Sequence, residues 1–197
     1  STPLYSSAAS DVYKRQVDAG VTVRALSGGE IEKRHWDAFW HFYRNTSDRK
    51  WGQAYLTRDF FTRISETMAD KVVLVVAEAG NQIVAGALNL RGTDTLYGRN
   101  WGCSAHYPFL HFEACYYQAI DYAIRHGLKR VEAGAQGQHK IQRGYLPVPT
   151  YSAHWIEDAR FRRAVADFLE RERAAVAAGI EELTEFSPFR REDGSAG

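Results

Sequence analysis

The chain has 197 residues, of which 45% are hydrophobic and 13% aromatic, and its formal net charge is +1. This composition predicts a globular fold with its own core and excludes disorder over most of the chain. The near-zero charge also excludes DNA binding through a broad basic surface.

The first sixteen residues differ from the rest of the chain. Residues 1–10 are mostly small and polar, and the hexapeptide DVYKRQ follows them at 11–16. This hexapeptide resembles the translation of a transposon end sequence used in preparing sequencing libraries. We therefore expect 1–16 to be a non-native or disordered leader, with a genuine flexible N-terminus as the alternative, and we expect the gene to extend upstream. We expect one domain over 17–190 and a disordered tail over 191–197.

Hydrophobic periodicity and turn residues predict the elements that follow the leader. In chain order they are a strand at 21–26, a helix at 30–46, a helix that begins at Thr57, strands at 72–77, 83–90 and 95–101, a helix at 110–126, a strand at 129–133, and one long helix or two over 159–183. Thr57 is a suitable N-cap, and Gly127 is placed to end the helix at 110–126. The predicted fold class is α/β, with a mixed and mostly antiparallel sheet flanked by helices.

Membrane and metal signals are weak in this sequence. No apolar run approaches the ~20 residues that cross a bilayer, and the N-terminus lacks the pattern of a signal peptide. The two cysteines, Cys103 and Cys115, lie in apolar contexts and lack the paired spacing of a zinc site. We expect reduced, buried thiols, no metal and a cytoplasmic location.

Three motifs resemble one bacterial family. They are YGRNWGC at Tyr97–Cys103, PFLHFEACYYQ at Pro108–Gln118 and EAGAQGQHKIQRG at Glu132–Gly144. These motifs look like those of the FemAB-like predicted N-acyltransferases, known as peptidoglycan biosynthesis or recognition proteins, and the resemblance covers nearly everything after Gly20. The order of elements likewise resembles the GNAT acyltransferase fold.

The resemblance implies transfer of an acyl or aminoacyl group to an amine. Full members of the family contain two tandem acyltransferase-like halves, and this chain resembles the C-terminal half only. The implied partners are the missing N-terminal half, a small-molecule or peptide amine acceptor, and an acyl donor. The implied donor is acyl-CoA or aminoacyl-tRNA as a co-substrate, with no permanently bound cofactor.

Four residues are candidate catalytic groups. Glu132 ends a predicted central strand, where a carboxylate is costly to bury, so we expect a general base or amine anchor, with a structural ion pair as the alternative. His139 titrates near neutral pH and is a candidate proton shuttle. His111 and Glu113 open the long helix, where residues two apart diverge by about 200° unless the turn is irregular. The alternative for Glu113 is a first-turn acid stabilised by the helix dipole.

The glycine-rich stretch after Glu132 contains candidate binding residues. Gln136, Lys140 and Arg143 lie among glycines, which allow a backbone to approach a ligand closely. Lys140 and Arg143 could bind a phosphate or carboxylate. The alternative is a solvated polar loop.

Weaker signals mark three further binding candidates. Arg99 begins an Arg-x-x-Gly-x-Ser run that faintly resembles the phosphate-binding turn of acetyltransferases. Trp51 and Tyr55 precede the second helix, where acyltransferases of this shape form the acceptor wall. Two other functions stay open: a non-catalytic recognition module that binds a cell-wall precursor, and a structural half that packs against the missing half.

Overall fold

The computed structural model describes residues 20–49, 54–134 and 138–189. The chain divides into two compact units, residues 1–134 and residues 135–197. The predicted leader at 1–16 and the predicted tail at 191–197 lie outside the described residues, so both stay predictions.

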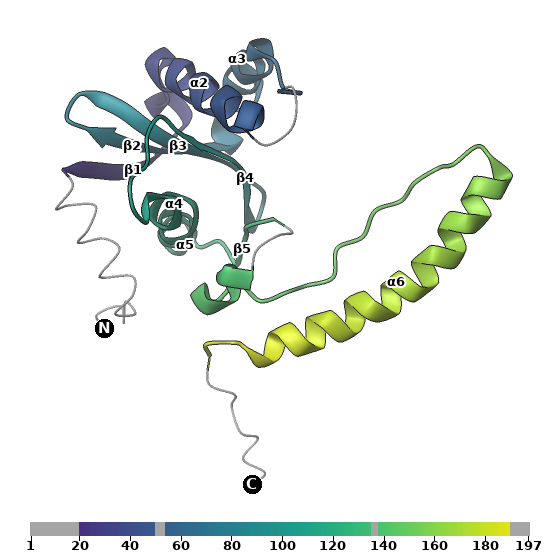
Figure 1. Cartoon of the computed structure of the whole chain (residues 1–197). Helices are drawn as coiled ribbons and strands as arrows, with labels where there is room; N and C mark the ends of the chain where they lie inside the picture. The colour runs from purple at the N-terminus through teal and green to yellow at the C-terminus, as the bar shows by residue number, and fades with distance from the viewer. Residues whose placement is uncertain (1–19, 50–53, 135–137, 190–197) are drawn as a thin grey trace, which may run out of the picture. The chain divides into compact units, whose positions relative to one another are not determined.

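The first unit contains one five-stranded sheet with the strand order β1-β2-β3-β4-β5 (Figure 1). The strands are β1 (Val21–Ser27), β2 (Val72–Ala79), β3 (Gln82–Arg91), β4 (Thr95–Cys103) and β5 (Arg130–Glu132). The first four pair antiparallel with their neighbours, and β5 is parallel to β4. The predicted mixed, mostly antiparallel sheet is therefore confirmed.

Helices cover both faces of this sheet (Figure 1). On one face lie α2 (Lys33–Arg49) and α3 (Arg58–Thr67), and on the other lies a continuous helical segment made of α4 (Leu110–Phe112), the π-helical turn η3 (Glu113–Tyr117) and α5 (Gln118–Arg125). Two short 3-10 turns, η1 (Gly28–Glu30) and η2 (Ala69–Lys71), lie before α2 and before β2. The predicted α/β fold class and the predicted order of strands and helices are confirmed.

The core lies on both sides of the central strand β2, whose residues 72–77 are all buried. Val72, Leu74 and Val76 pack against the aromatic side chains of α2 and α3. Val73 and Val75 point to the other face, toward α5 and η3. Because side chains alternate across a strand, a continuous apolar run is what a strand covered on both faces requires.

The two residues predicted to begin and to end helices have the expected geometry. The Thr57 hydroxyl accepts a hydrogen bond from the backbone N–H of Phe60, so Thr57 caps α3 as predicted. Gly127 has a φ of +64°, which suits the residue that follows a helix.

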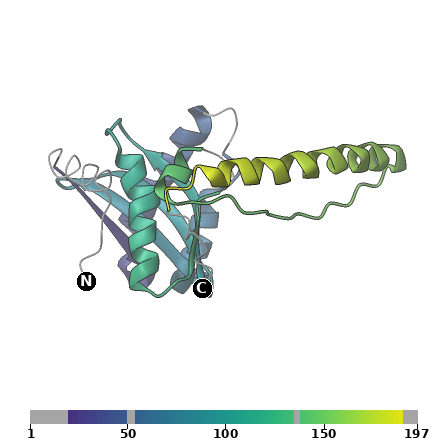
Figure 2. The ribbon, with the colours of Figure 1, turned by 90° about the horizontal axis from the view of Figure 1, so that it is seen from below.

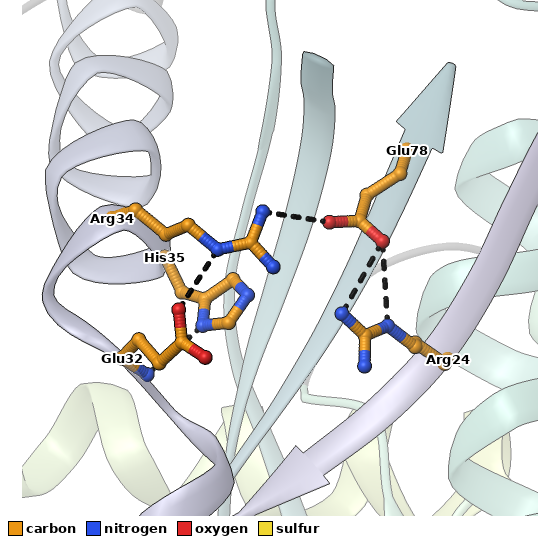
Figure 3. A network of polar contacts seen from close by, with 5 residues as sticks. All are labelled: Arg24, Glu32, Arg34, His35 and Glu78. Atoms are coloured by element: carbon orange, nitrogen blue, oxygen red, sulfur yellow. Dashed lines mark hydrogen bonds and ion pairs between the residues drawn. The ribbon is translucent and has the colours of Figure 1, made fainter. Parts of the chain in front are cut away.

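A polar network joins β1, β2 and the start of α2 (Figure 3). Glu78 of β2 accepts from Arg24 of β1 and from Arg34 of α2, at 3.3 and 3.2 Å. Arg34 also pairs with Glu32 at 3.0 Å, and His35 Nδ1 accepts from the backbone N–H of Glu32 at 2.9 Å. The network therefore ties the first turn of α2 to the sheet.

The second unit contains the 3-10 turn η4 (Gln138–Arg143) and the helix α6 (Ala159–Glu185). The Asp158 carboxylate caps α6 by accepting from the backbone N–H groups of Arg160 and Phe161. Figure 2 shows α6 as one uninterrupted helix, which resolves the prediction of one helix or two. None of the helices that the structure describes is long and apolar enough to cross a membrane.

Candidate functional site

The sheet of the first unit has an open edge along the second half of β4. β5 pairs with β4 only at Thr95, Leu96 and Tyr97, and in the described part of the chain no strand pairs with β4 beyond Tyr97 on that side. The segment Gly98–Cys103 therefore presents backbone N–H and C=O groups that a ligand can bind. We call this segment the β4 edge.

Helix α2 forms one wall beside the β4 edge. A Cβ atom on Gly102 would lie 2.5 Å from the backbone oxygen of Phe42 in α2, so only glycine allows this contact. A Cβ atom on Gly86 of β3 would similarly lie 2.8 Å from the ring of Phe39. Two glycines thus allow α2 to pack directly on the strands that carry the candidate site.

A β-bulge in β4 turns Arg99 out of the regular register. Leu88 of β3 pairs with Asn100, and Asn89 pairs with Gly98, so Arg99 has no partner residue across the strands. A bulge re-aims the side chain of the extra residue and increases the local twist. Arg99 is exposed beside the β4 edge, where its guanidinium is available to an anionic group.

A hollow of about 400 Å³ lies where β4 ends and the next helix begins. Its lining residues are Trp101, Cys103, Ala105, His106, Tyr107, Pro108, Phe109, Leu110, His111 and Phe112. Four of these side chains are aromatic rings of Trp, Tyr or Phe, two are imidazoles, and none is an acid, a lysine or an arginine. We call this feature the aromatic hollow.

His111 belongs to the wall of the aromatic hollow. Its ring packs edge-on against Trp101 of β4 and against Tyr116 of η3, each at 5.4 Å between ring centroids. The predicted candidate His111 therefore lies beside β4, in α4, and α4 covers the face of the sheet opposite α2 (Figure 1).

Phe109 enters α4 in a left-handed backbone conformation, with φ 63° and ψ −2°. It is the only residue other than glycine with a positive φ in the described chain. A non-glycine residue there costs roughly 1–3 kcal/mol. Phe109 is 40% exposed, and its ring lies 6.2 Å from the ring of Phe112 between centroids.

Glu113 is buried in the π-helical turn η3, with 4% of its surface exposed. Burial raises the pKa of its carboxyl, an effect opposed by the hydrogen bond that Gln118 Nε2 donates to its Oε1 at 2.9 Å. Glu113 is absent from the hollow's lining, whereas His111 is part of it. The turn is irregular, yet only His111 lines the hollow, and Glu113 lies in the first turn of η3, where the alternative places it.

Glu132 lies at the other end of the β4 edge. It pairs with Tyr97, which is four residues before Trp101, so the two ends are about 13 Å apart at ~3.3 Å per residue. The expectation that Glu132 ends a central strand is wrong, because β5 is an edge strand and the Glu132 side chain is exposed. Its catalytic role stays a prediction.

An ion pair holds β5 at this end of the sheet. Arg130 donates to both carboxylate oxygens of Asp94, at 3.2 and 3.0 Å, and to the hydroxyl of Thr95. The backbone N–H groups of Lys129 and Arg130 donate to the backbone oxygen of Asp94. The turn before β4 thereby fixes the place where Glu132 ends β5.

The turn η4 of the second unit brings together three predicted residues, His139, Lys140 and Arg143. Arg143 Nη1 donates to the backbone oxygen of His139 at 2.7 Å, which closes the turn on itself. The backbone oxygen of Lys140 accepts from the N–H of Tyr145. Lys140 and Arg143 therefore lie on the same turn, and one nitrogen of the Arg143 guanidinium stabilises that turn by its hydrogen bond to His139.

Of the remaining predicted residues, the structure describes Tyr55 and the two cysteines. Tyr55 is 75% exposed and contacts the ring of Tyr43 edge-on at 6.3 Å. Trp51 and Gln136 lie outside the described residues, so their predicted binding roles stay predictions. Cys103 and Cys115 are free thiols and are half buried.

Sequence reasoning missed most of the aromatic hollow. His106, Tyr107 and Phe109 lie between the strand predicted at 95–101 and the helix predicted at 110–126, where the sequence predicts no element. The available signal was the density of aromatic and imidazole side chains over 106–112, without helical or strand periodicity. Across residues 20–49, 54–134 and 138–189, no cluster of three or more His, Cys, Asp or Glu residues suits a metal ion.

A family model matches the chain over residues 12–191. It is the model for FemAB-like proteins, described as peptidoglycan biosynthesis/recognition. No curated protein matches the chain at a significant level.

Solved structures show a distant similarity to the chain. An aminoglycoside acetyltransferase from an uncultured soil metagenomic sample, in complex with sisomicin, has a TM-score of 0.49 at 11% identity, covering 72% of this chain and 98% of that one. L-PGS from Bacillus licheniformis has a TM-score of 0.49 at 13% identity, covering 66% of this chain and 42% of that one. An aminoglycoside N-acetyltransferase in complex with CoA has a TM-score of 0.48 at 10% identity, covering 70% and 95%. Similarity at this level carries no information on substrate or reaction.

Proposed function

Because the chain belongs to the FemAB-like family, we propose that it is an N-acyltransferase that moves an acyl or aminoacyl group to an amine in peptidoglycan biosynthesis. The observation that carries this proposal is the β4 edge, which has the aromatic hollow at one end and the exposed carboxylate of Glu132 at the other. A bacterial source and a cytoplasmic location are part of the same proposal.

The reaction forms one bond and breaks another. The amine nitrogen attacks the acyl carbonyl carbon, an N–C bond forms, and the bond from that carbon to the sulfur or oxygen of the donor breaks. The amine loses a proton, and the leaving thiolate or alkoxide gains one. The protein must therefore supply a proton acceptor and hydrogen-bond donors for the carbonyl oxygen.

The β4 edge would supply both. Its backbone N–H groups would donate to the carbonyl oxygen of a donor that lies along Gly98–Cys103. Glu132 would accept the amine proton or hold the ammonium form of the acceptor, because it is the carboxylate at the end of this edge. Arg99, turned out by the bulge, would hold an anionic group of one substrate.

Other predicted residues keep narrower roles. His111 would hold the wall of the aromatic hollow, since its ring packs between Trp101 and Tyr116. On η4, Lys140 and Arg143 stay candidate anion-binding residues and His139 a candidate acid or base. The donor is acyl-CoA or aminoacyl-tRNA, and Tyr55 is a candidate contact for the acceptor.

The test is a transfer assay on the protein with a panel of acyl-CoA and aminoacyl-tRNA donors and with amine acceptors that include peptidoglycan precursors. Glu132→Gln should lower kcat/KM by about 10²–10⁴-fold, the range for a general base, and Lys140→Ala should raise KM for the donor. Glu66→Gln, an exposed acid on α3, is the matched control and should leave the rate unchanged. Full activity in both the Glu132 and Lys140 variants would show that these roles are wrong.

A second candidate function is recognition without catalysis. The large apolar side chains exposed in the second unit favour it, because such groups mark surfaces that bind partners. They include Tyr151, Trp155, Phe161 and Phe168. Recognition without catalysis is supported if peptidoglycan precursors bind the protein while neither acyl-CoA nor aminoacyl-tRNA donors support transfer.

A further inference from the structure

Building on the proposed acyl transfer, we propose that the aromatic hollow is the subsite for a neutral, apolar acyl group larger than acetyl. The proposal makes the protein selective for donors with an extended aliphatic or aromatic acyl portion. It rests on three properties of the hollow: its lining, its size and the strained residue at its rim.

The lining suits a neutral occupant. Trp101, Tyr107, Phe109 and Phe112 present rings, and among the described residues that line the hollow none is an acid, a lysine or an arginine. A phosphate or a carboxylate would lose its hydration there without a full positive charge to replace it, and an ammonium group would recover only about 0.5–2 kcal/mol from the faces of the rings. An apolar chain gains free energy by leaving water for the same surface.

The size exceeds what an acetyl group needs. Three non-hydrogen atoms, each with roughly the volume of a water molecule, take up about 90 Å³. The hollow of about 400 Å³ is several times larger. A longer acyl group would therefore bury more apolar surface and bind more tightly, by about fourfold for each added methylene until the hollow is filled.

Phe109 is the third observation. Its left-handed backbone places an exposed ring at the hollow, next to Phe112 at 6.2 Å between ring centroids. Glycine would adopt this conformation without strain, so a structural role of the turn alone would favour glycine over phenylalanine. A ring that covers bound ligand gives the strained phenylalanine a function.

The place of the hollow fits this use. Trp101 belongs both to its wall and to the β4 edge, so an acyl chain in the hollow continues into a carbonyl group on that edge. The carbonyl carbon then lies on the edge between Trp101 and Glu132, and the attacking amine nitrogen lies between that carbon and the Glu132 carboxylate. Apolar and polar parts of the two substrates are thereby separated along one strand.

The experiment measures binding without catalysis. Thioesters of N-acetylcysteamine with acyl chains of two to ten carbons contain no phosphate or nucleotide, so they probe the hollow whichever donor the protein uses. Isothermal titration calorimetry on the whole chain should show affinity that rises about fourfold per methylene and then levels off. Hexylammonium, a cation of similar length, should bind at least tenfold more weakly than the hexanoyl thioester.

Two variants make the test specific. Ala105→Phe places a ring in the hollow and should remove the dependence on chain length. Phe109→Gly relieves the backbone strain but removes a partly buried ring, so the protein should still unfold cooperatively, yet it should bind the octanoyl thioester about tenfold or more weakly. Ile124→Ala, which removes an exposed apolar side chain of α5, is the control and should keep the chain-length dependence.

Three results would overturn the proposal: equal affinity for acetyl and octanoyl thioesters, a chain-length dependence that survives in Ala105→Phe, or tighter binding of hexylammonium. Failure of the transferase function looks different. In that case long thioesters bind and no donor supports transfer, so the subsite stands without the reaction. If the protein transfers acyl groups but binds short and long thioesters equally well, the acyl subsite is wrong and the transferase function stands.

Discussion

At the scale of single residues, His35 shows how a buried imidazole couples stability to pH. The side chain is 1% exposed, Nδ1 accepts from the backbone N–H of Glu32, and Nε2 has no hydrogen-bond partner among the described residues. Burial lowers the pKa of His35, and the nearby Arg34 guanidinium lowers it further. The neutral ring with the proton on Nε2 is the form that this site accepts.

This lowered pKa predicts a loss of stability in mild acid. Between the folded-state pKa and the ordinary value near 6.5, the unfolded chain binds a proton that the folded chain does not. The free energy of unfolding should therefore fall as pH falls from about 7 through that window. His35→Asn keeps an acceptor for the Glu32 N–H and should flatten the dependence, as measured by urea unfolding between pH 5 and 8. His41→Asn, at an exposed position of the same helix, should leave the slope unchanged.

Glu113 predicts the opposite dependence on pH. Its folded-state pKa is raised by burial, so the folded protein holds a proton that the unfolded chain releases as pH rises above the usual value near 4.5. Stability is then lost as pH rises through the folded-state pKa. Glu113→Gln is neutral, has the same shape and keeps an acceptor for Gln118, so it should raise the free energy of unfolding at pH 7. A less stable variant would mean that the ionised carboxylate itself is needed.

At the scale of elements, the contact between α2 and β4 depends on Gly102. A Cβ atom there would meet the Phe42 backbone oxygen at 2.5 Å, and a backbone atom in a packed helix cannot move away cheaply. Gly102→Ala should lower the free energy of unfolding by about 1–3 kcal/mol, as measured in urea. Gly29→Ala meets nothing within 4 Å and is the matched control, with an expected change within about 0.5 kcal/mol. Equal effects at the two positions would contradict the close packing.

Helices and strands were predictable where they depend on residues close together in the sequence. The arrangement of the candidate site was not predictable, because it depends on residues far apart in the sequence. The apolar run of β2 and the cap at Thr57 depend on neighbouring residues, so sequence reasoning found both. The exposure of Glu132 depends on β5 being a short edge strand that pairs through three residues, which no local pattern encodes. The aromatic hollow likewise depends on the way residues 104–109 return from β4 to α4. Chemistry-bearing residues could be named from sequence, but the open edge that relates them could not.

At the scale of the whole molecule, the two compact units differ in how they are stabilised. The first contains a sheet with helices on both faces and buried clusters on each side of β2. In the second, α6 buries no residue along its 27 positions. An isolated helix is only marginally stable in water, because its stability comes mostly from packing of an apolar face. The two units should therefore respond differently when each is produced alone.

A fragment of residues 20–134 should fold by itself, because its sheet and its covering helices lie in one unit. It should unfold in one cooperative transition in urea and keep the near-ultraviolet circular dichroism of packed aromatic side chains. A fragment of residues 138–189 should show partial helicity that melts gradually on heating, since helix alone gives little cooperativity at this length. A fragment 20–134 without a near-ultraviolet signal would mean that its core needs residues beyond 134. Retained binding of the octanoyl thioester by this fragment would further show that the β4 edge and the aromatic hollow are complete within the first unit, since every lining residue lies between 101 and 112.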